Sequence, residues 1–98
     1  MANATASVSG VVIAETDNYE TVEGNIYFPP ESIKQEYFST TDTHTACPWK
    51  GAASYYTVDV GDGVPLTDVA WYYPEPKSAA ANIKGYVAFY RNKIYIRS

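Results

Sequence analysis

Two segments rich in aromatic and β-branched residues, separated by a glycine turn, constrain this chain most. Ala53–Val60 reads ASYYTVDV, Leu66–Tyr73 reads LTDVAWYY, and the turn residues 61–63 read GDG. Alternate side chains of a strand point to the same face, so Trp71 and Tyr73 share one face of the second segment. Glycines beside an aspartate are typical of a turn between antiparallel strands. The pattern predicts a β-hairpin in the middle of the chain.

The remaining sequence also favours β structure. The 98 residues include one Leu but nine Val, six Ile, nine Thr and ten Tyr, and branched and aromatic side chains suit a pleated, half-buried surface. Further strands are expected at 8–16, 22–28, 86–90 and 94–98, the last two as a closing hairpin. Residues 39–51 are expected to form a loop, and the alanine run before Gly85 predicts a short helix near residues 77–83.

These elements predict the fold class and the domain organisation. We expect one domain over residues 1–98, with the small, polar residues 1–6 disordered. The fold class is mainly β, as a single small antiparallel barrel or a two-sheet β domain.

Charge argues against several classes of partner. There are 7 Lys and Arg against 11 Asp and Glu, and this net charge of −4 gives no electrostatic reason to bind nucleic acid or an anionic membrane. Lys84, Arg91, Lys93 and Arg97 form the one basic group, which we interpret as a solvated edge. No apolar stretch approaches the ~20 residues that cross a bilayer, and no signal peptide pattern is present. We therefore expect a cytoplasmic protein without nucleic-acid or membrane partners.

Several motifs occur in a fixed order along the chain. The segments THTACPWKGAASYYTV, AWYYPEP and AANIKGYVAFY follow an N-terminal VEGNIYFPPESI. Together they resemble the bacterial and fungal family called domain of unknown function 427, over about residues 8–97. The resemblance rests on Cys47-Pro48, Lys50-Gly51, Trp71, Tyr73-Pro74, Pro76 and Ala88-Phe89-Tyr90. It implies a compact, mainly β single domain, and the family's occasional nucleotidyltransferase-like label implies nucleotide-related chemistry.

The segment THTACPWKG contains the only His and the only Cys of the chain. His44 and Cys47 are metal-ligand types, but a structural zinc site needs four such ligands, so we expect no metal. Cys47 is also a candidate nucleophile, since His44 and Lys50 flank it and a nearby cation favours a thiolate. A free Cys before Pro48 is more often a small buried side chain, and this interpretation ranks higher.

An acid/base pocket is the preferred enzyme hypothesis. Lys50, Glu75 and His44 would be its polar groups, because burial beside aromatic rings adjusts a lysine pKa for proton transfer. The ligand-binding walls would be Trp49, Trp71, Tyr73 and Tyr56. In the competing structural interpretation, Lys50 pairs with Glu75 or another carboxylate and holds the loop to the sheet.

Three functions follow, in order of preference. The first is binding of a small organic molecule in an aromatic-lined pocket, with cofactor-free acid/base catalysis as its candidate chemistry. The second is a non-catalytic module whose aromatic face forms a homodimer or docks a protein partner. Nucleotide chemistry is third, because the chain has no Asp-x-Asp pair and no GxxxxGK[ST] loop. A pocket lined by Lys50 would favour the first, and an ion-paired Lys50 with exposed apolar residues would favour the second.

Overall fold

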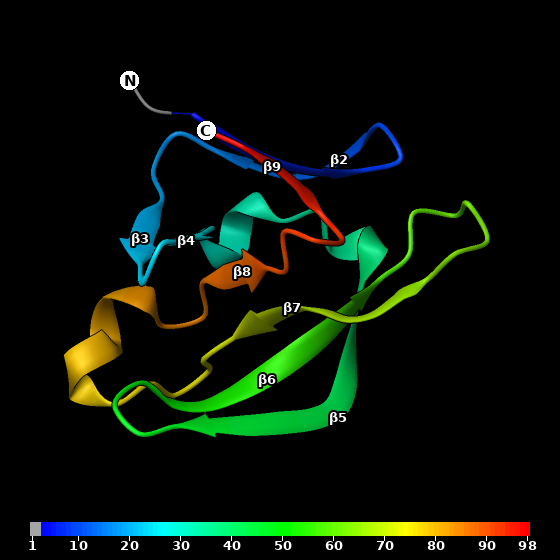
Figure 1. The fold of residues 1–98 in the computed structure, drawn as a ribbon. Coiled ribbons are helices and arrows are strands. Elements are labelled where there is room, and N and C mark those ends of the chain that lie inside the picture. The colour runs from blue at the N-terminus through cyan, green and yellow to red at the C-terminus, as the bar shows by residue number, and fades with distance from the viewer. Residues whose placement is uncertain (1–2) are drawn as a thin grey trace.

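Nine strands and three short 3-10 helices make up residues 3–98, the part of the chain that this computed structural model describes (Figure 1). The strands are β1 (Ala4–Val8), β2 (Val11–Thr16), β3 (Glu20–Val22), β4 (Asn25–Tyr27), β5 (Phe38–Cys47), β6 (Gly51–Val58), β7 (Leu66–Tyr72), β8 (Val87–Phe89) and β9 (Tyr95–Arg97). The helices are η1 (Pro30–Ser32), η2 (Gln35–Tyr37) and η3 (Ser78–Ile83). The mainly β fold and the short helix near 77–83 are confirmed. None of the helices in residues 3–98 has the length and apolarity needed to cross a membrane.

The strands form three sheets, and those of residues 3–98 do not close into a barrel. Their orders are β2-β1-β9, β3-β4 and β5-β6-β7-β8. The β3-β4 ribbon joins the four-stranded sheet through Phe28, whose N–H and carbonyl each bond Val87 at 2.8 Å. Figure 1 shows the β2-β1-β9 sheet stacked over the four-stranded sheet, with η3 at the far end of the latter.

The predicted central hairpin is confirmed. Strands β6 and β7 pair antiparallel, with Tyr55 opposite Trp71 and Ser54 opposite Tyr72. The aromatic doublets divide between the two faces of the sheet, as alternation requires. Tyr55 is buried on one face, while Tyr56 stacks on Tyr72 on the other with ring centroids 4.5 Å apart.

The N-terminal predictions need correction. Residues 8–16 do not form one strand, because a tight turn at Ser9 and Gly10 separates β1 from β2. Both turn residues have positive φ, 51° and 79°, the conformation that two-residue hairpin turns require. Within the segment predicted to be disordered, residues 1–2 lie outside the described part, whereas Ala4 and Ala6 are fully buried in β1.

The predicted C-terminal hairpin is wrong. Strand β8 pairs with β7, whereas β9 crosses to the other sheet and pairs with β1. The turn after Tyr90, whose carbonyl accepts the N–H groups of Lys93 and Ile94, redirects the chain. Ile94 is 1% exposed and packs in the core, so burying this residue between the sheets outweighs a local β8–β9 pairing.

The predicted loop at 39–51 is largely strand β5. Its pairing with β6 shifts register between Thr40 and His44, and the shift breaks the alternation that would have revealed a strand. Threonine-rich sequence is compatible with β structure as well as with turns. The turn proper covers only residues 48–50, between β5 and β6.

The four-stranded sheet has a hydrophobic cluster on each face. The larger cluster includes Phe28, Val87, Phe89 and Ile94 and lies against the β2-β1-β9 sheet. The smaller cluster gathers side chains from the ribbon, the sheet and η3: Tyr27, Ala53, Tyr55, Tyr73, Ala80, Ile83 and Ala88. Lys50 adjoins this second cluster through its contact with Tyr73.

Candidate functional site

Lys50 ends the turn between β5 and β6 and is buried, with 6% of its surface exposed. Its Nζ donates to the carboxylate of Glu23, which is 53% exposed. Glu23 lies in the tight turn between β3 and β4 at a φ of 54°, so the ion pair joins two hairpin turns. The structural interpretation predicted a pair with Glu75 or another carboxylate; the partner is Glu23, and Glu75 is exposed in the segment after β7.

Two aromatic rings and a backbone bond also hold Lys50. Its Nζ lies 4.9 Å from the Trp49 ring centroid and 5.7 Å from that of Tyr73, within cation–π range. Its carbonyl accepts the N–H of Lys77 at 2.9 Å. These contacts agree with the structural interpretation, in which the lysine holds the loop to the sheet through a carboxylate.

The protonation states of the pair follow from this geometry. Burial opposes the charged ammonium, but the hydrogen bond to Glu23, together with the electrostatic effects of Tyr73, Tyr27 and Cys47, outweighs it, and the pKa of Lys50 lies above its ordinary 10.5. The same hydrogen bond lowers the pKa of Glu23 below its ordinary 4.5. Both groups are therefore charged at neutral pH. A lysine in this state is a poor general base, because its pKa has moved away from the working range.

Acid should weaken the Lys50–Glu23 ion pair, and comparison with the variant Glu23→Gln should reveal the loss. A lowered carboxylate pKa stabilises the fold above pH 4.5, and this contribution disappears as pH falls through the folded-state value. The raised lysine pKa stabilises the fold below 10.5, so the link is complete between about pH 4.5 and 10.5. Between pH 6 and pH 3, the urea concentration at the midpoint of unfolding should fall further for wild type than for Glu23→Gln. Glu15→Gln, an exposed carboxylate of β2, should behave as wild type, and an equal loss in all three proteins would contradict the link.

The structure brings some of the other predicted site residues to this cluster. Cys47 and Trp71 pack against the smaller hydrophobic cluster beside Tyr73, and Trp71 Nε1 donates to Tyr27 Oη at 3.1 Å. Burial opposes a Cys47 thiolate, but the N–H groups of Lys50 and Trp49 and the Lys50 charge place the pKa of the thiol below its ordinary 9.0. Burial raises the pKa of Tyr73 to about 12, so its hydroxyl stays neutral.

The remaining predicted residues lie elsewhere. His44 is exposed on β5, with Nδ1 3.2 Å from Ser54 Oγ. Tyr56 packs against Tyr72 and Phe38 on the other face of the sheet. Within residues 3–98, no group of three His, Cys, Asp or Glu side chains is arranged to hold a metal ion. Of the three polar groups of the predicted acid/base set, Lys50 is paired with Glu23, whereas Glu75 and His44 are exposed.

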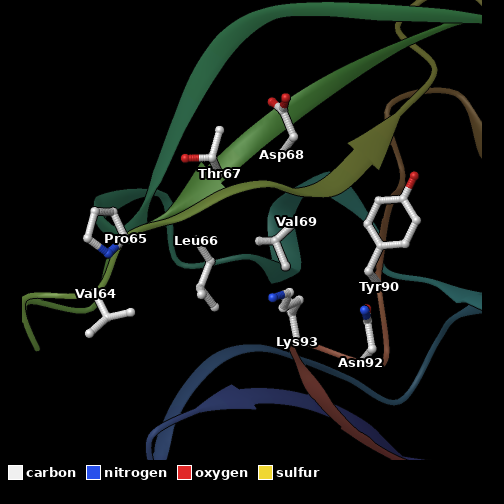
Figure 2. A pocket seen from close by; sticks show the side chains of 9 residues that line it. All are labelled: Val64, Pro65, Leu66, Thr67, Asp68, Val69, Tyr90, Asn92 and Lys93. Atoms are coloured by element: carbon white, nitrogen blue, oxygen red, sulfur yellow. The ribbon is translucent and has the colours of Figure 1, made fainter.

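A cleft lies beside β7, and Lys50 is not among the residues that line it. Its volume is about 440 Å³, and we call it the β7 cleft. It is lined by Val64, Pro65, Leu66, Thr67, Asp68, Val69, Tyr90, Asn92 and Lys93 (Figure 2). Sequence reasoning did not identify it. Two sequence features noted above lie close to this cleft. They are the turn residues Gly61–Gly63 before β7 and the basic residues of the C-terminal segment.

An irregularity in β7 forms the floor of the β7 cleft. The β6–β7 pairing shifts register between Tyr56 and Val58, and Asp68 has a φ of 54°. Figure 2 shows Leu66 and Val69 on the side of β7 that faces Lys93, with Thr67 and Asp68 on the other side. A regular strand would have sent Leu66 and Val69 to opposite faces. The bulge thus places two apolar side chains in one cleft, an effect that bulges commonly have.

The Asp68 carboxylate holds this bulge against β5. It accepts the hydroxyls of Thr41 at 2.7 Å and Thr43 at 2.5 Å. The bond from Thr43, followed by that from Thr41, lowers the pKa of Asp68 below its ordinary 3.8. The carboxylate is therefore ionised at neutral pH. Its negative charge accepts these two hydroxyls on the side of β7 opposite the cleft floor.

Tyr90 forms one wall of the β7 cleft. Its ring centroid lies 4.7 Å from that of Trp71, and its N–H donates to the carbonyl of Val69 at 3.0 Å. A hydrogen bond with Tyr55, together with burial, raises the pKa of Tyr90 to about 12. The wall is therefore a neutral phenol fixed against a second ring. Such a surface suits an apolar or aromatic ligand group.

The relationship of the chain to known proteins extends over nearly its entire length. A comparison with curated proteins finds no match. The family described as domain of unknown function (DUF427) matches residues 2–97. The match covers the Cys47–Gly51 loop, both clusters and the β7 cleft, and it confirms the resemblance seen in the motifs. The chain therefore belongs to the domain of unknown function 427 family.

Proposed function

We propose that the protein binds a small organic anion in the β7 cleft. The cleft volume of about 440 Å³ carries the proposal, because ligand sites of this type measure about 300–1,000 Å³. Such sites combine an apolar lining with a few polar groups. Here Leu66, Val69 and the Tyr90 ring supply the apolar part, while Asn92 and Lys93 supply the polar part.

The charge preference follows from the two ionised residues of the lining. The Asp68 carboxylate already accepts two threonine hydroxyls on the far side of β7. The Lys93 side chain points toward Leu66 and Val69, so an ammonium faces the cleft floor (Figure 2). A ligand with an anionic or strongly accepting group would therefore be favoured over a cation.

Binding is better supported than acid/base catalysis. The enzyme hypothesis required a pocket lined by Lys50 or His44, and the β7 cleft contains neither. The Lys50 ammonium is instead paired with the Glu23 carboxylate, and the Lys50 carbonyl accepts the Lys77 N–H. Among the cleft residues, Tyr90 has a pKa of about 12, too high for proton transfer near neutral pH.

Three probes with the same ring and different charge test the proposal. Phenylacetate, benzyl alcohol and benzylamine should be titrated into ¹⁵N-labelled protein and followed by chemical-shift changes. Phenylacetate should shift the amide resonances of 64–69 and 90–93 and bind about fivefold more tightly than benzylamine, the range of an exposed charge pair. Lys93→Met should remove this preference while retaining the side-chain stem.

Lys84→Met is the matched control, because Lys84 is an exposed lysine outside the cleft lining. This variant should retain the preference for phenylacetate. The proposal fails if phenylacetate leaves the cleft resonances unshifted. It also fails if the two lysine variants bind phenylacetate identically.

A specific observation favours the interaction module as a second candidate. Lys50 is ion-paired, and the exposed large apolar side chains within residues 3–98 are Trp49, Val64, Tyr90 and Tyr95. Contiguous patches of exposed apolar side chains are typical of association surfaces. Sedimentation velocity over a hundredfold range of protein concentration would separate the two candidates. A monomer throughout would count against the homodimer.

A further inference from the structure

A second cavity continues the β7 cleft toward the other sheet. Its volume is about 320 Å³, and we call it the β9 cavity. It shares Val64, Leu66 and Lys93 with the β7 cleft, so the two hollows have a common wall region. Its far side comes from β1 and β9 and includes Val8 and the exposed ring of Tyr95. The two hollows adjoin at Val64, Leu66 and Lys93, and we call them together the groove.

A fixed carboxylate lines the β9 cavity. Asp62 accepts the Ser9 hydroxyl at 2.9 Å with one oxygen and the Val64 N–H at 3.0 Å with the other. These bonds, the one from Val64 first, lower the pKa of Asp62 below its ordinary 3.8, so the group is ionised at neutral pH. An ionised carboxylate offers about four acceptor sites, so two remain for a ligand donor.

The groove therefore presents its charges in a definite order. Val69 and the Tyr90 wall belong to the β7 cleft alone, Leu66 and Lys93 line both hollows, and Asp62 belongs to the β9 cavity alone. A complementary ligand has groups of opposite charge in the same order. It has an apolar end, then an anion, then a cation or strong hydrogen-bond donor.

We propose that the ligand is an elongated zwitterion that spans both hollows. Its apolar group lies in the β7 cleft, its anion meets Lys93, and its ammonium meets Asp62 beyond the shared wall. This inference rests on the proposed function of the β7 cleft and adds the chemistry of the second end. Aromatic compounds that carry a carboxylate and a separate amine, short peptides with a C-terminal aromatic residue among them, have this order of groups.

Glycyl-phenylalanine and N-acetyl-glycyl-phenylalanine form the test pair, because acetylation converts the ammonium into a neutral amide and leaves the rest of the peptide unchanged. In wild type, glycyl-phenylalanine should bind about fivefold more tightly, the upper range for an exposed ion pair, and should shift the amides of residues 7–9 and 62. Asp62→Asn should reduce the ratio of the two affinities to about one. The acetylated peptide should bind this variant as it binds wild type.

Asp59→Asn is the control, since Asp59 caps the same loop by accepting the Gly61 N–H at 2.8 Å but lines neither hollow. It should retain the fivefold ratio, and thermal melting should verify that both variants fold. Equal binding of the two peptides by wild type would overturn the zwitterion inference. If phenylacetate still binds in that case, the proposed function stands, whereas failure of all three probes would overturn both.

Discussion

Lys50→Ala should lower the free energy of unfolding by about 2 kcal/mol, the lower end of the range for truncating a long buried side chain. The lysine is 6% exposed, and its removal leaves space between the Trp49 and Tyr73 rings as well as an unpaired Glu23. Because Glu23 is half exposed, water can solvate its carboxylate, and this limits the loss. Urea unfolding at pH 7 measures the effect.

Two further lysine variants separate charge from packing. Lys50→Met keeps an unbranched stem between the rings and should lose less than half as much stability as the alanine variant. Lys77→Ala removes an exposed lysine that bonds the carbonyl of Pro48 at 2.7 Å, and it should cost under about 1 kcal/mol. A loss below about 1 kcal/mol for Lys50→Ala would show that the Lys50–Glu23 link contributes little to stability.

Phe28→Ala should have the largest effect on stability, about 4 kcal/mol. The Phe28 ring is fully buried and meets the Phe89 ring edge-on, with centroids 5.5 Å apart. Its backbone joins the β3-β4 ribbon to β8 through the paired bonds with Val87. Domains of this size are stable by about 5–15 kcal/mol, so the variant should unfold at much lower urea concentration.

The matched variant Phe28→Leu keeps most of the apolar volume and should lose only about 1 kcal/mol. Both variants retain the backbone bonds to Val87 and lack the ring, so the difference between them reports the buried apolar volume beyond Cβ. If the alanine variant unfolds at nearly the wild-type urea concentration, the Phe28 side chain is not a principal support of the core.

Local patterns account for the parts of the fold that the sequence predicts well. The β6–β7 hairpin joins neighbouring segments, and alternation alone places Tyr55 and Tyr56 on opposite faces. The alanine run that forms η3 is likewise a local signal. Some residues that carry the family resemblance, such as Trp71 and Tyr73-Pro74, lie in or directly after the β6–β7 hairpin.

Long-range contacts and unusual backbone conformations account for what the sequence did not predict. The partner of Lys50 is Glu23, twenty-seven positions away, at a positive φ that glutamate rarely adopts. The floor of the β7 cleft depends on Asp68, a second residue with positive φ. No periodicity marks such positions, because each is held by tertiary bonds such as those from Thr41 and Thr43. The acid/base hypothesis joined Lys50 to His44 of the same segment and to Glu75 of the YYPEP segment, and so missed both.

The pairing of β1 with β9 has a consequence for the rate of folding. Thr5 opposite Arg97 closes nearly the whole chain into one loop, and contacts between such distant residues form slowly. The β1–β2 hairpin and the four-stranded sheet can form earlier from local contacts. Until β9 arrives, one side of β1 has unpaired N–H and carbonyl groups, which can pair with another chain. Self-association of this protein should therefore be greatest during refolding and decline once β9 has docked.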